Sequence, residues 1–121
     1  MWRILYADQD KDSLEVLKVA FETVDADLHV DCLDRMEYLE QVIGPKLWDA
    51  YLIDLDFNDT GIDLCRQIRS LDPQGPVLFL TSYALETQRL EALNAGARGY
   101  FSKPLDLEGL RMTIRELLNE K

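Results

Sequence analysis

Short apolar runs alternate with longer segments of helical spacing along the whole chain. Five runs predict buried strands: Arg3–Ala7, Leu28–Leu33, Ala50–Asp54, Val77–Thr81 and Gly99–Ser102. Several of them are continuously apolar, which is typical of parallel strands covered on both faces. The run Leu28–Leu33 instead alternates apolar and polar residues, which predicts a strand at the edge of the sheet.

Each run is followed by apolar residues three or four positions apart, as on one face of a helix. These stripes are Leu14, Leu17, Phe21 and Val24; Met36, Leu39 and Ile43; Leu64, Ile68 and Leu71; Leu90, Leu93 and Ala97; and Leu107, Leu110, Ile114 and Leu117. Asp34 with Glu37 is typical of a capping box, and Asp106 is an expected N-cap. Five strand–helix units predict an α/β fold, doubly wound in three layers around a five-stranded parallel sheet.

Length and charge limit the classes of function. A chain of 121 residues matches one domain, so we expect a single domain over residues 1–121. Acidic residues outnumber basic ones 23 to 13, and the net charge of -10 disfavours direct binding to nucleic acids or anionic membranes.

The cysteines and the N-terminal residues exclude further classes. Cys32 and Cys65 lie far apart, without CxxC spacing and with only His29 as a histidine, so no zinc site is expected. We expect both cysteines to be small buried apolar side chains. The N-terminal apolar run is too short for a signal peptide or a membrane span, which predicts a cytoplasmic location.

Polar side chains close four of the five apolar runs. The four ends read Asp8-Gln9-Asp10, Asp54-Leu55-Asp56, Thr81-Ser82 and Ser102-Lys103-Pro104. Because the carboxyl ends of parallel strands meet at one edge of the sheet, we expect these groups to lie together. Of these residues, Asp10 is expected to interact with the N-terminal dipole of the next helix instead.

The chemistry of this edge points to a phosphoryl group. A carboxylate can attack phosphorus to form an acyl phosphate, provided that a divalent cation held by oxygen ligands offsets the charge repulsion. Asp8 and Asp54 supply acidic ligands for Mg²⁺. Lys103 is placed to neutralise phosphoryl oxygens, and the Thr81 hydroxyl can donate a hydrogen bond to one of them.

The order of these residues resembles the receiver domain of two-component response regulators, the CheY-like superfamily. The matching segments are ILYADQD, DAYLIDLD, PVLFLTSY and LNAGARGYFSKPLD, so the resemblance covers the whole chain. It implies a flavodoxin-like (βα)5 fold with strand order 2-1-3-4-5.

The resemblance also implies roles for individual residues. Asp54 would be the phosphoacceptor, receiving its phosphoryl group from a phosphohistidine on a sensor histidine kinase. Asp8, Asp54 and the backbone carbonyl of Asp56 would hold Mg²⁺ or Mn²⁺, and Lys103 would pair with the phosphoryl group. Such a domain is a signalling domain, with at most self-catalysed phosphoryl transfer and autodephosphorylation.

The readout of phosphorylation is implied in the same way. Thr81 and Tyr100 resemble the switch pair of the family, in which a hydroxyl moves toward the phosphate and an aromatic ring turns inward. This movement would reshape the face of the fourth helix, the fifth strand and the fifth helix. The implied partners are a downstream effector domain or protein and, through that same face, a second copy of the chain.

Three departures from the family pattern bear on the site. Gln9 stands where the family usually has a second acid, typically the direct metal ligand, so metal binding is expected to be weaker. The loop LDFNDTGIDL is one residue shorter and lacks the usual proline. Asp56 and Tyr83 occupy positions that tune how fast water removes the phosphoryl group in the family.

Two alternatives remain open at this point. Gln9 and the altered loop allow a degenerate receiver that acts as a phosphorylation-independent protein-interaction module. The segment LIDLDFNDT also resembles the first motif of haloacid-dehalogenase phosphatases, with Thr81 or Ser82 and Lys103 in later roles. That family opens with this motif on its first strand, whereas the acids at Asp8 and Asp10 precede it here.

Overall fold

The computed structural model describes residues 1–35, 38–43, 48–55, 61–82, 85–103 and 106–120. Its strands are β1 (Trp2–Ala7), β2 (Leu28–Leu33), β3 (Ala50–Asp54), β4 (Val77–Thr81) and β5 (Gly99–Ser102). They form one parallel sheet in the order β2-β1-β3-β4-β5. The predicted fold class and the edge position of the second strand are therefore confirmed.

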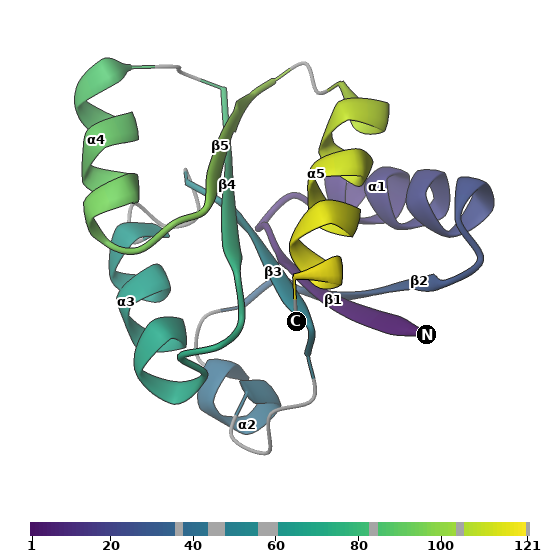
Figure 1. Cartoon of the computed structure of the whole chain (residues 1–121), viewed down its shortest axis with the longest axis horizontal. Coiled ribbons are helices and arrows are strands. Elements are labelled where there is room, and N and C mark those ends of the chain that lie inside the picture. Colours follow the sequence, from purple (N-terminus) through teal and green to yellow (C-terminus); the bar gives the residue numbers. More distant parts are fainter. Residues whose placement is uncertain (36–37, 44–47, 56–60, 83–84, 104–105, 121) are drawn as a thin grey trace.

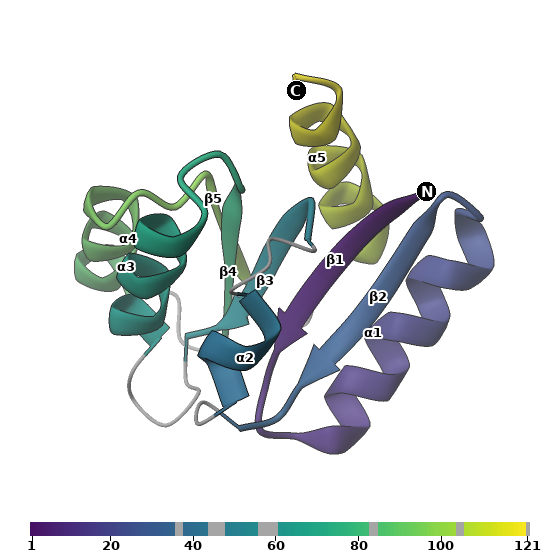
Figure 2. The same cartoon turned by 90° about the horizontal axis from the view of Figure 1, so that it is seen from below.

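Helices cover both faces of the sheet. They are α1 (Lys11–Val24), α2 (Leu39–Ile43), α3 (Gly61–Leu71), α4 (Glu86–Asn94) and α5 (Leu107–Asn119). Figures 1 and 2 show α1 and α5 on one face and α2, α3 and α4 on the other. None of the described helices has both the length and the apolar character needed to cross a bilayer.

Alternate residues of each strand enter two separate cores. Along β1, Ile4 and Tyr6 pack in the core under α1 and α5, whereas Leu5 and Ala7 pack in the core under α2, α3 and α4. The strands β3 and β4 are buried along their entire length, as expected for the centre of a doubly covered sheet. The continuous apolar runs in the sequence thus correspond to strands that helices cover on both faces.

Aspartates begin the two helices that lie on the same face. Asp10 caps α1, and its carboxylate accepts hydrogen bonds from the Asp12 N–H at 3.1 Å and the Ser13 hydroxyl at 2.8 Å. Asp106 caps α5 and accepts from the Gly109 N–H at 3.0 Å, which confirms the predicted cap. The predicted capping box at Glu37 and the stripe residue Met36 lie outside the described residues.

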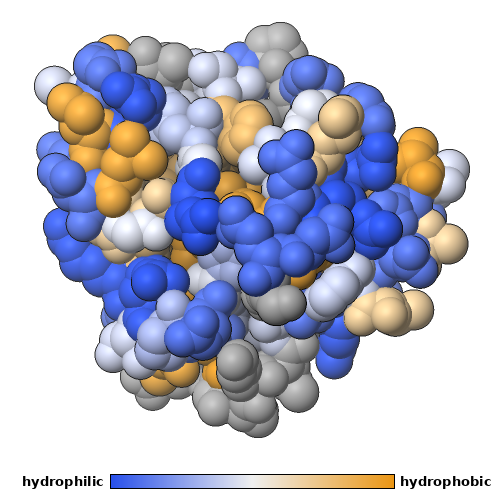
Figure 3. Space-filling view, viewed as in Figure 1, coloured by the Kyte–Doolittle hydropathy of each residue, from blue (hydrophilic) through white to orange (hydrophobic). Residues whose placement is uncertain are grey.

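The predicted apolar stripe of the fourth helix is wrong. Leu90 and Leu93 are 48% and 40% exposed, whereas Ala97 is buried as expected but lies beyond the end of the helix. The buried residue of α4 is Ala92, so the helix turns Ala92 to the core and its leucines to solvent. Figure 3 shows the resulting apolar surface over α4.

Three smaller expectations about burial are also wrong. Val24 and Leu71 are exposed, and each is the last residue of its helix, α1 or α3. Cys32 is exposed near the end of the edge strand, with its Sγ 3.8 Å from the Leu14 carbonyl oxygen. Cys65 is buried as predicted.

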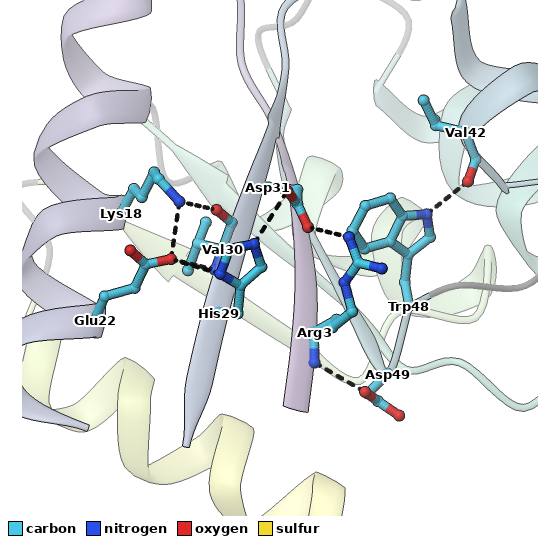
Figure 4. Close-up of polar contacts among 9 residues, drawn as sticks. All are labelled: Arg3, Lys18, Glu22, His29, Val30, Asp31, Val42, Trp48 and Asp49. Atoms are coloured by element: carbon cyan, nitrogen blue, oxygen red, sulfur yellow. Dashed lines mark hydrogen bonds and ion pairs between the residues drawn. The ribbon is translucent and has the colours of Figure 1, made fainter. Parts of the chain in front are cut away.

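Side chains of α1 cap the backbone of the edge strand β2. The Lys18 ammonium donates to the Val30 carbonyl at 2.7 Å, and the Val30 N–H donates to the Glu22 carboxylate at 2.9 Å. Lys18 and Glu22 also pair with each other at 2.8 Å (Figure 4). Since exposed strand edges pair readily with other strands, this Lys18–Glu22 clamp protects the β2 edge.

The β1–β2 pair is held further by Arg3. Its guanidinium donates to Asp31 at 2.9 Å and lies 4.7 Å from the ring centroid of Trp48. The Trp48 indole N–H in turn donates to the Val42 carbonyl at 2.8 Å, which ties α2 to this end of the sheet (Figure 4).

We predict that Glu22→Ala lowers the free energy of unfolding by about 1–2 kcal/mol at pH 7, because the Val30 N–H loses its acceptor. Burial raises the pKa of Glu22, but the hydrogen bonds from Lys18 and Val30 lower it overall below its ordinary value. A carboxylate with a lowered pKa stabilises the fold above its ordinary pKa of 4.5 and loses that effect as pH falls. The difference between the two proteins should therefore shrink below that pH.

Urea denaturation at several pH values measures this effect. Glu15→Ala, at an exposed position of the same helix, is the matched control and should leave stability nearly unchanged. Equal losses in the two variants would contradict the role of the clamp.

Candidate functional site

Four predicted site residues lie at the carboxyl ends of the strands. Asp8 directly follows β1, Asp54 and Thr81 end β3 and β4, and Lys103 directly follows β5. The Lys103 backbone N–H donates to the Thr81 carbonyl at 2.7 Å, which fixes the end of β5 beside β4. We refer to Asp8, Asp54, Thr81 and Lys103 as the strand-end cluster.

One ammonium group joins the two carboxylates of the cluster. The Lys103 Nζ donates to the Asp54 Oδ2 at 2.8 Å and lies 3.6 Å from the Asp8 Oδ2. Asp8 and Asp54 are only 1% and 5% exposed, and Thr81 is fully buried. Two buried acids that are distant in sequence therefore share a single cation, whose side chain is 25% exposed.

Asp8 is held by two further donors. Its Oδ2 accepts a hydrogen bond from the Tyr6 hydroxyl at 2.7 Å, and its Oδ1 accepts one from the Asp10 N–H at 2.9 Å. Tyr6 was not among the residues expected at the site from the sequence. The signal available was its position two residues before an acid on a strand, which places both side chains on the same face.

Burial and the neighbouring charged groups both shift the pKa values of Asp8 and Lys103. Burial raises the pKa of Asp8 above its ordinary value, with the nearby Asp54 adding to the rise, while the Tyr6 and Asp10 hydrogen bonds oppose it. Burial lowers the pKa of Lys103, but the hydrogen bond to Asp54 and the charges of both acids raise it overall. Lys103 therefore stays a cation at neutral pH.

The donor atoms of the cluster are of the kind that Mg²⁺ binds. Asp8 and Asp54 offer carboxylate oxygens, Gln9 is exposed directly after Asp8, and Asp56 lies outside the described residues. Within the described ranges, no three His, Cys, Asp or Glu side chains are grouped as metal ligands. The set suits a hard cation that keeps several waters and takes few carboxylates, rather than a fully protein-ligated ion.

The two predicted switch residues occupy neighbouring strands. Thr81 is buried at the end of β4. Tyr100 is half-buried within β5 and packs against the core under α2, α3 and α4. This placement puts Tyr100 on the side of the sheet that α4 covers. Tyr83 and Pro104, the other positions named from the sequence, lie outside the described residues.

Comparison with known proteins gives a consistent set of relatives. Residues 4–115 match the response regulator receiver domain family. Response regulator MprA from Mycobacterium leprae is 35% identical over 119 residues, which cover 96% of this chain and 50% of MprA. Transcriptional regulatory protein ZraR from Klebsiella oxytoca is 36% identical over 84 residues, which cover 69% of this chain and 19% of ZraR. The chain thus spans half or less of the length of these curated relatives.

A solved structure is similar over nearly the whole chain. The crystal structure of a CheY-like response regulator receiver domain protein from Methanospirillum hungatei has a TM-score of 0.89 to this chain. The two are 27% identical, and the alignment covers 99% of this chain and 95% of the other.

We predict that Asp8→Asn stabilises the protein at pH 7 without divalent cations, by on the order of 1 kcal/mol, because it removes one of two neighbouring buried anions. An acid with a raised pKa destabilises the fold above that pKa, and the cost disappears as pH falls and the acid takes up a proton. The advantage of the variant should therefore shrink as pH falls toward 3.8, the ordinary value for Asp8.

Denaturant unfolding in a chelating buffer measures this difference. Glu15→Gln, an exposed change in the middle of α1, serves as the control and should show little effect. A destabilised Asp8→Asn protein at pH 7 would contradict the electrostatic description of the cluster.

Proposed function

This chain belongs to the response regulator receiver domain family, and we propose that it accepts a phosphoryl group on Asp54 and thereby switches a protein-interaction surface. Receiver domains are signalling domains rather than classical enzymes. The observation that supports Asp54 is its ion pair with Lys103 at 2.8 Å beside the buried Asp8.

The proposed transfer is a displacement at phosphorus. An Asp54 carboxylate oxygen forms the new P–O bond, and the bond between phosphorus and the donor breaks. The donor, such as the imidazole nitrogen of a phosphohistidine, leaves with the electron pair. The product on the protein is an acyl phosphate.

Lys103 and Asp8 are proposed to prepare Asp54 for this attack. The Lys103 ammonium reduces the repulsion between the carboxylate and the incoming phosphoryl oxygens, and can then pair with one of those oxygens. Asp8 and Asp54 would hold Mg²⁺, which would supply further positive charge to the phosphoryl oxygens. The Thr81 hydroxyl, at the end of the next strand, is proposed to donate a hydrogen bond to the phosphoryl group.

The partners follow from the same proposal. A sensor histidine kinase would supply the phosphoryl group, and a downstream effector domain or protein would respond to it. The Thr81 and Tyr100 pair is proposed to couple the phosphoryl group to the face of α4, β5 and α5. Self-catalysed loss of the phosphoryl group to water would end the signal.

Two other functions predict different behaviour. Gln9, in place of an acid, favours a degenerate receiver that binds partners without phosphorylation. The family assignment weighs against the phosphatase alternative, as does the position of the motif, because the DxD motif follows the first strand in that family, whereas Asp54 ends the third strand, β3, here.

We predict that incubation with acetyl phosphate and Mg²⁺ adds one phosphoryl group to the wild-type protein and none to Asp54→Ala, because the variant lacks the attacking carboxylate. Intact-mass spectrometry measures the adduct. Asp72→Asn is the matched control, since Asp72 is also a buried aspartate but pairs with Tyr51 at 2.7 Å. This control should be labelled like the wild type.

The outcome separates the three functions. An unlabelled wild-type protein would overturn the proposal in favour of the degenerate receiver. Repeated turnover of an aryl phosphate, without a lasting adduct, would favour the phosphatase.

The exposed leucines of α4 support a second part of the proposal, a homodimer through α4, β5 and α5. Leu90 and Leu93 lie at the surface of α4, and Met112 on α5 is 52% exposed. The helices α4 and α5 lie on opposite faces of the sheet at its β5 edge, and apolar groups exposed on both are suited to be covered by a second copy.

We predict that the phosphorylated protein sediments as a dimer and that Leu90→Asp prevents this, because a charge would be buried in the contact. Val19→Asp, at an exposed apolar position on α1, is the control and should leave the dimer intact. Unchanged sedimentation of phosphorylated Leu90→Asp would contradict this assignment of the interface.

A further inference from the structure

A buried hydroxyl contacts the acid at the end of β1. Tyr6 and Asp8 point to the same face of β1, and the phenol donates to the Asp8 Oδ2 at 2.7 Å. Tyr6 is only 1% exposed and packs in the core under α1 and α5. The hydroxyl therefore reaches the strand-end cluster from the interior of the protein.

This hydrogen bond fixes the direction of the Asp8 carboxylate. The Asp10 N–H holds the Oδ1, and the Tyr6 hydroxyl holds the Oδ2, so both oxygens have a fixed donor. The Oδ2 is also the oxygen that lies 3.6 Å from the Lys103 Nζ. Without the phenol, the side of Asp8 that faces Lys103 and Asp54 would be restrained by the longer Lys103 contact alone.

The phenol is a neutral hydrogen-bond donor at neutral pH, because a tyrosine hydroxyl ordinarily loses its proton only at about pH 10. A neutral donor restrains a carboxylate without cancelling its charge, and leaves the second lone pair of the oxygen available. Hydrogen bonds of this kind orient metal-ligating side chains in many proteins.

We propose that Tyr6 is a positioning residue of this site, whose hydroxyl holds Asp8 in the orientation from which its carboxylate binds a divalent cation beside Asp54. The inference rests on the proposed function, which makes Asp8 a metal ligand. It assigns to the core residue Tyr6 a part in metal affinity that its burial alone would not suggest.

The chain offers a matched control. Tyr51 is also 1% exposed, and its hydroxyl also donates at 2.7 Å to a buried aspartate, Asp72. Tyr51 packs on the other face of the sheet, in the core under α2, α3 and α4. Tyr6→Phe and Tyr51→Phe thus remove equivalent hydroxyls, but only the first of them contacts the strand-end cluster.

Replacement by phenylalanine also keeps the surroundings of Tyr6 intact. The Tyr6 ring helps line a groove of about 340 Å³ between α1 and α5, with Lys103 and Leu107 among its other walls. Phenylalanine fills the same space as the tyrosine ring. A change in metal affinity in Tyr6→Phe therefore reports the hydroxyl and not the packing.

The test is calorimetric titration of Mn²⁺ and Mg²⁺ into the wild type, Tyr6→Phe and Tyr51→Phe. We expect Tyr6→Phe to raise the dissociation constant for the cation about tenfold, the lower end of the range for such supporting contacts. Tyr51→Phe should keep the wild-type value. Denaturant unfolding of both variants verifies that each is folded under the titration conditions.

Three results would overturn the inference: unchanged affinity in Tyr6→Phe, an equal loss in Tyr51→Phe, or no cation binding by the wild type. Labelling of wild-type Asp54 by acetyl phosphate is measured separately. A wild type that binds the cation but is not labelled would defeat the proposed function, while the comparison of Tyr6→Phe with Tyr51→Phe would still decide the role of Tyr6.

Discussion

Two buried carboxylates that share one ammonium impose the main constraint on this structure. Asp8 and Asp54 end different strands, and the Lys103 side chain reaches both of them from a third. Like charges at this depth are costly unless a cation lies between them. The backbone pairing of the sheet holds the ends of β1, β3 and β5 where Lys103 can reach both acids.

The sheet meets this constraint by placing rigid elements behind each charged group. Asp54 ends a strand that is buried along its length, and the Lys103 backbone is tied to Thr81 at 2.7 Å. Asp8 is connected through Tyr6 to the core under α1 and α5. The charged atoms of the acidic site thus come from the residues that end the strands, and buried strand residues lie directly behind them.

The sequence indicated the parts of this structure that depend on local pattern. The five strands follow from continuous apolar runs, and the gathering of Asp8, Asp54 and Lys103 follows from the rule that parallel strands end at one edge. The orientation of α4 could not be predicted in this way. The helical spacing of Leu90 and Leu93 shows that they share one face of the helix, but it does not show whether that face or the face of Ala92 is turned to the core. Tyr6 was missed because a strand tyrosine looks like ordinary core until its hydroxyl is seen to contact Asp8.

The clamp over the β2 backbone makes the two flanks of the sheet unequal. With Lys18 and Glu22 on the Val30 backbone groups, a neighbouring molecule cannot extend the sheet from that side without displacing them. Open-ended polymers need two complementary flanks on every molecule, whereas a closed pair related by a two-fold axis needs only one. The contacts on Val30 therefore disfavour open-ended growth of the sheet through the β2 edge.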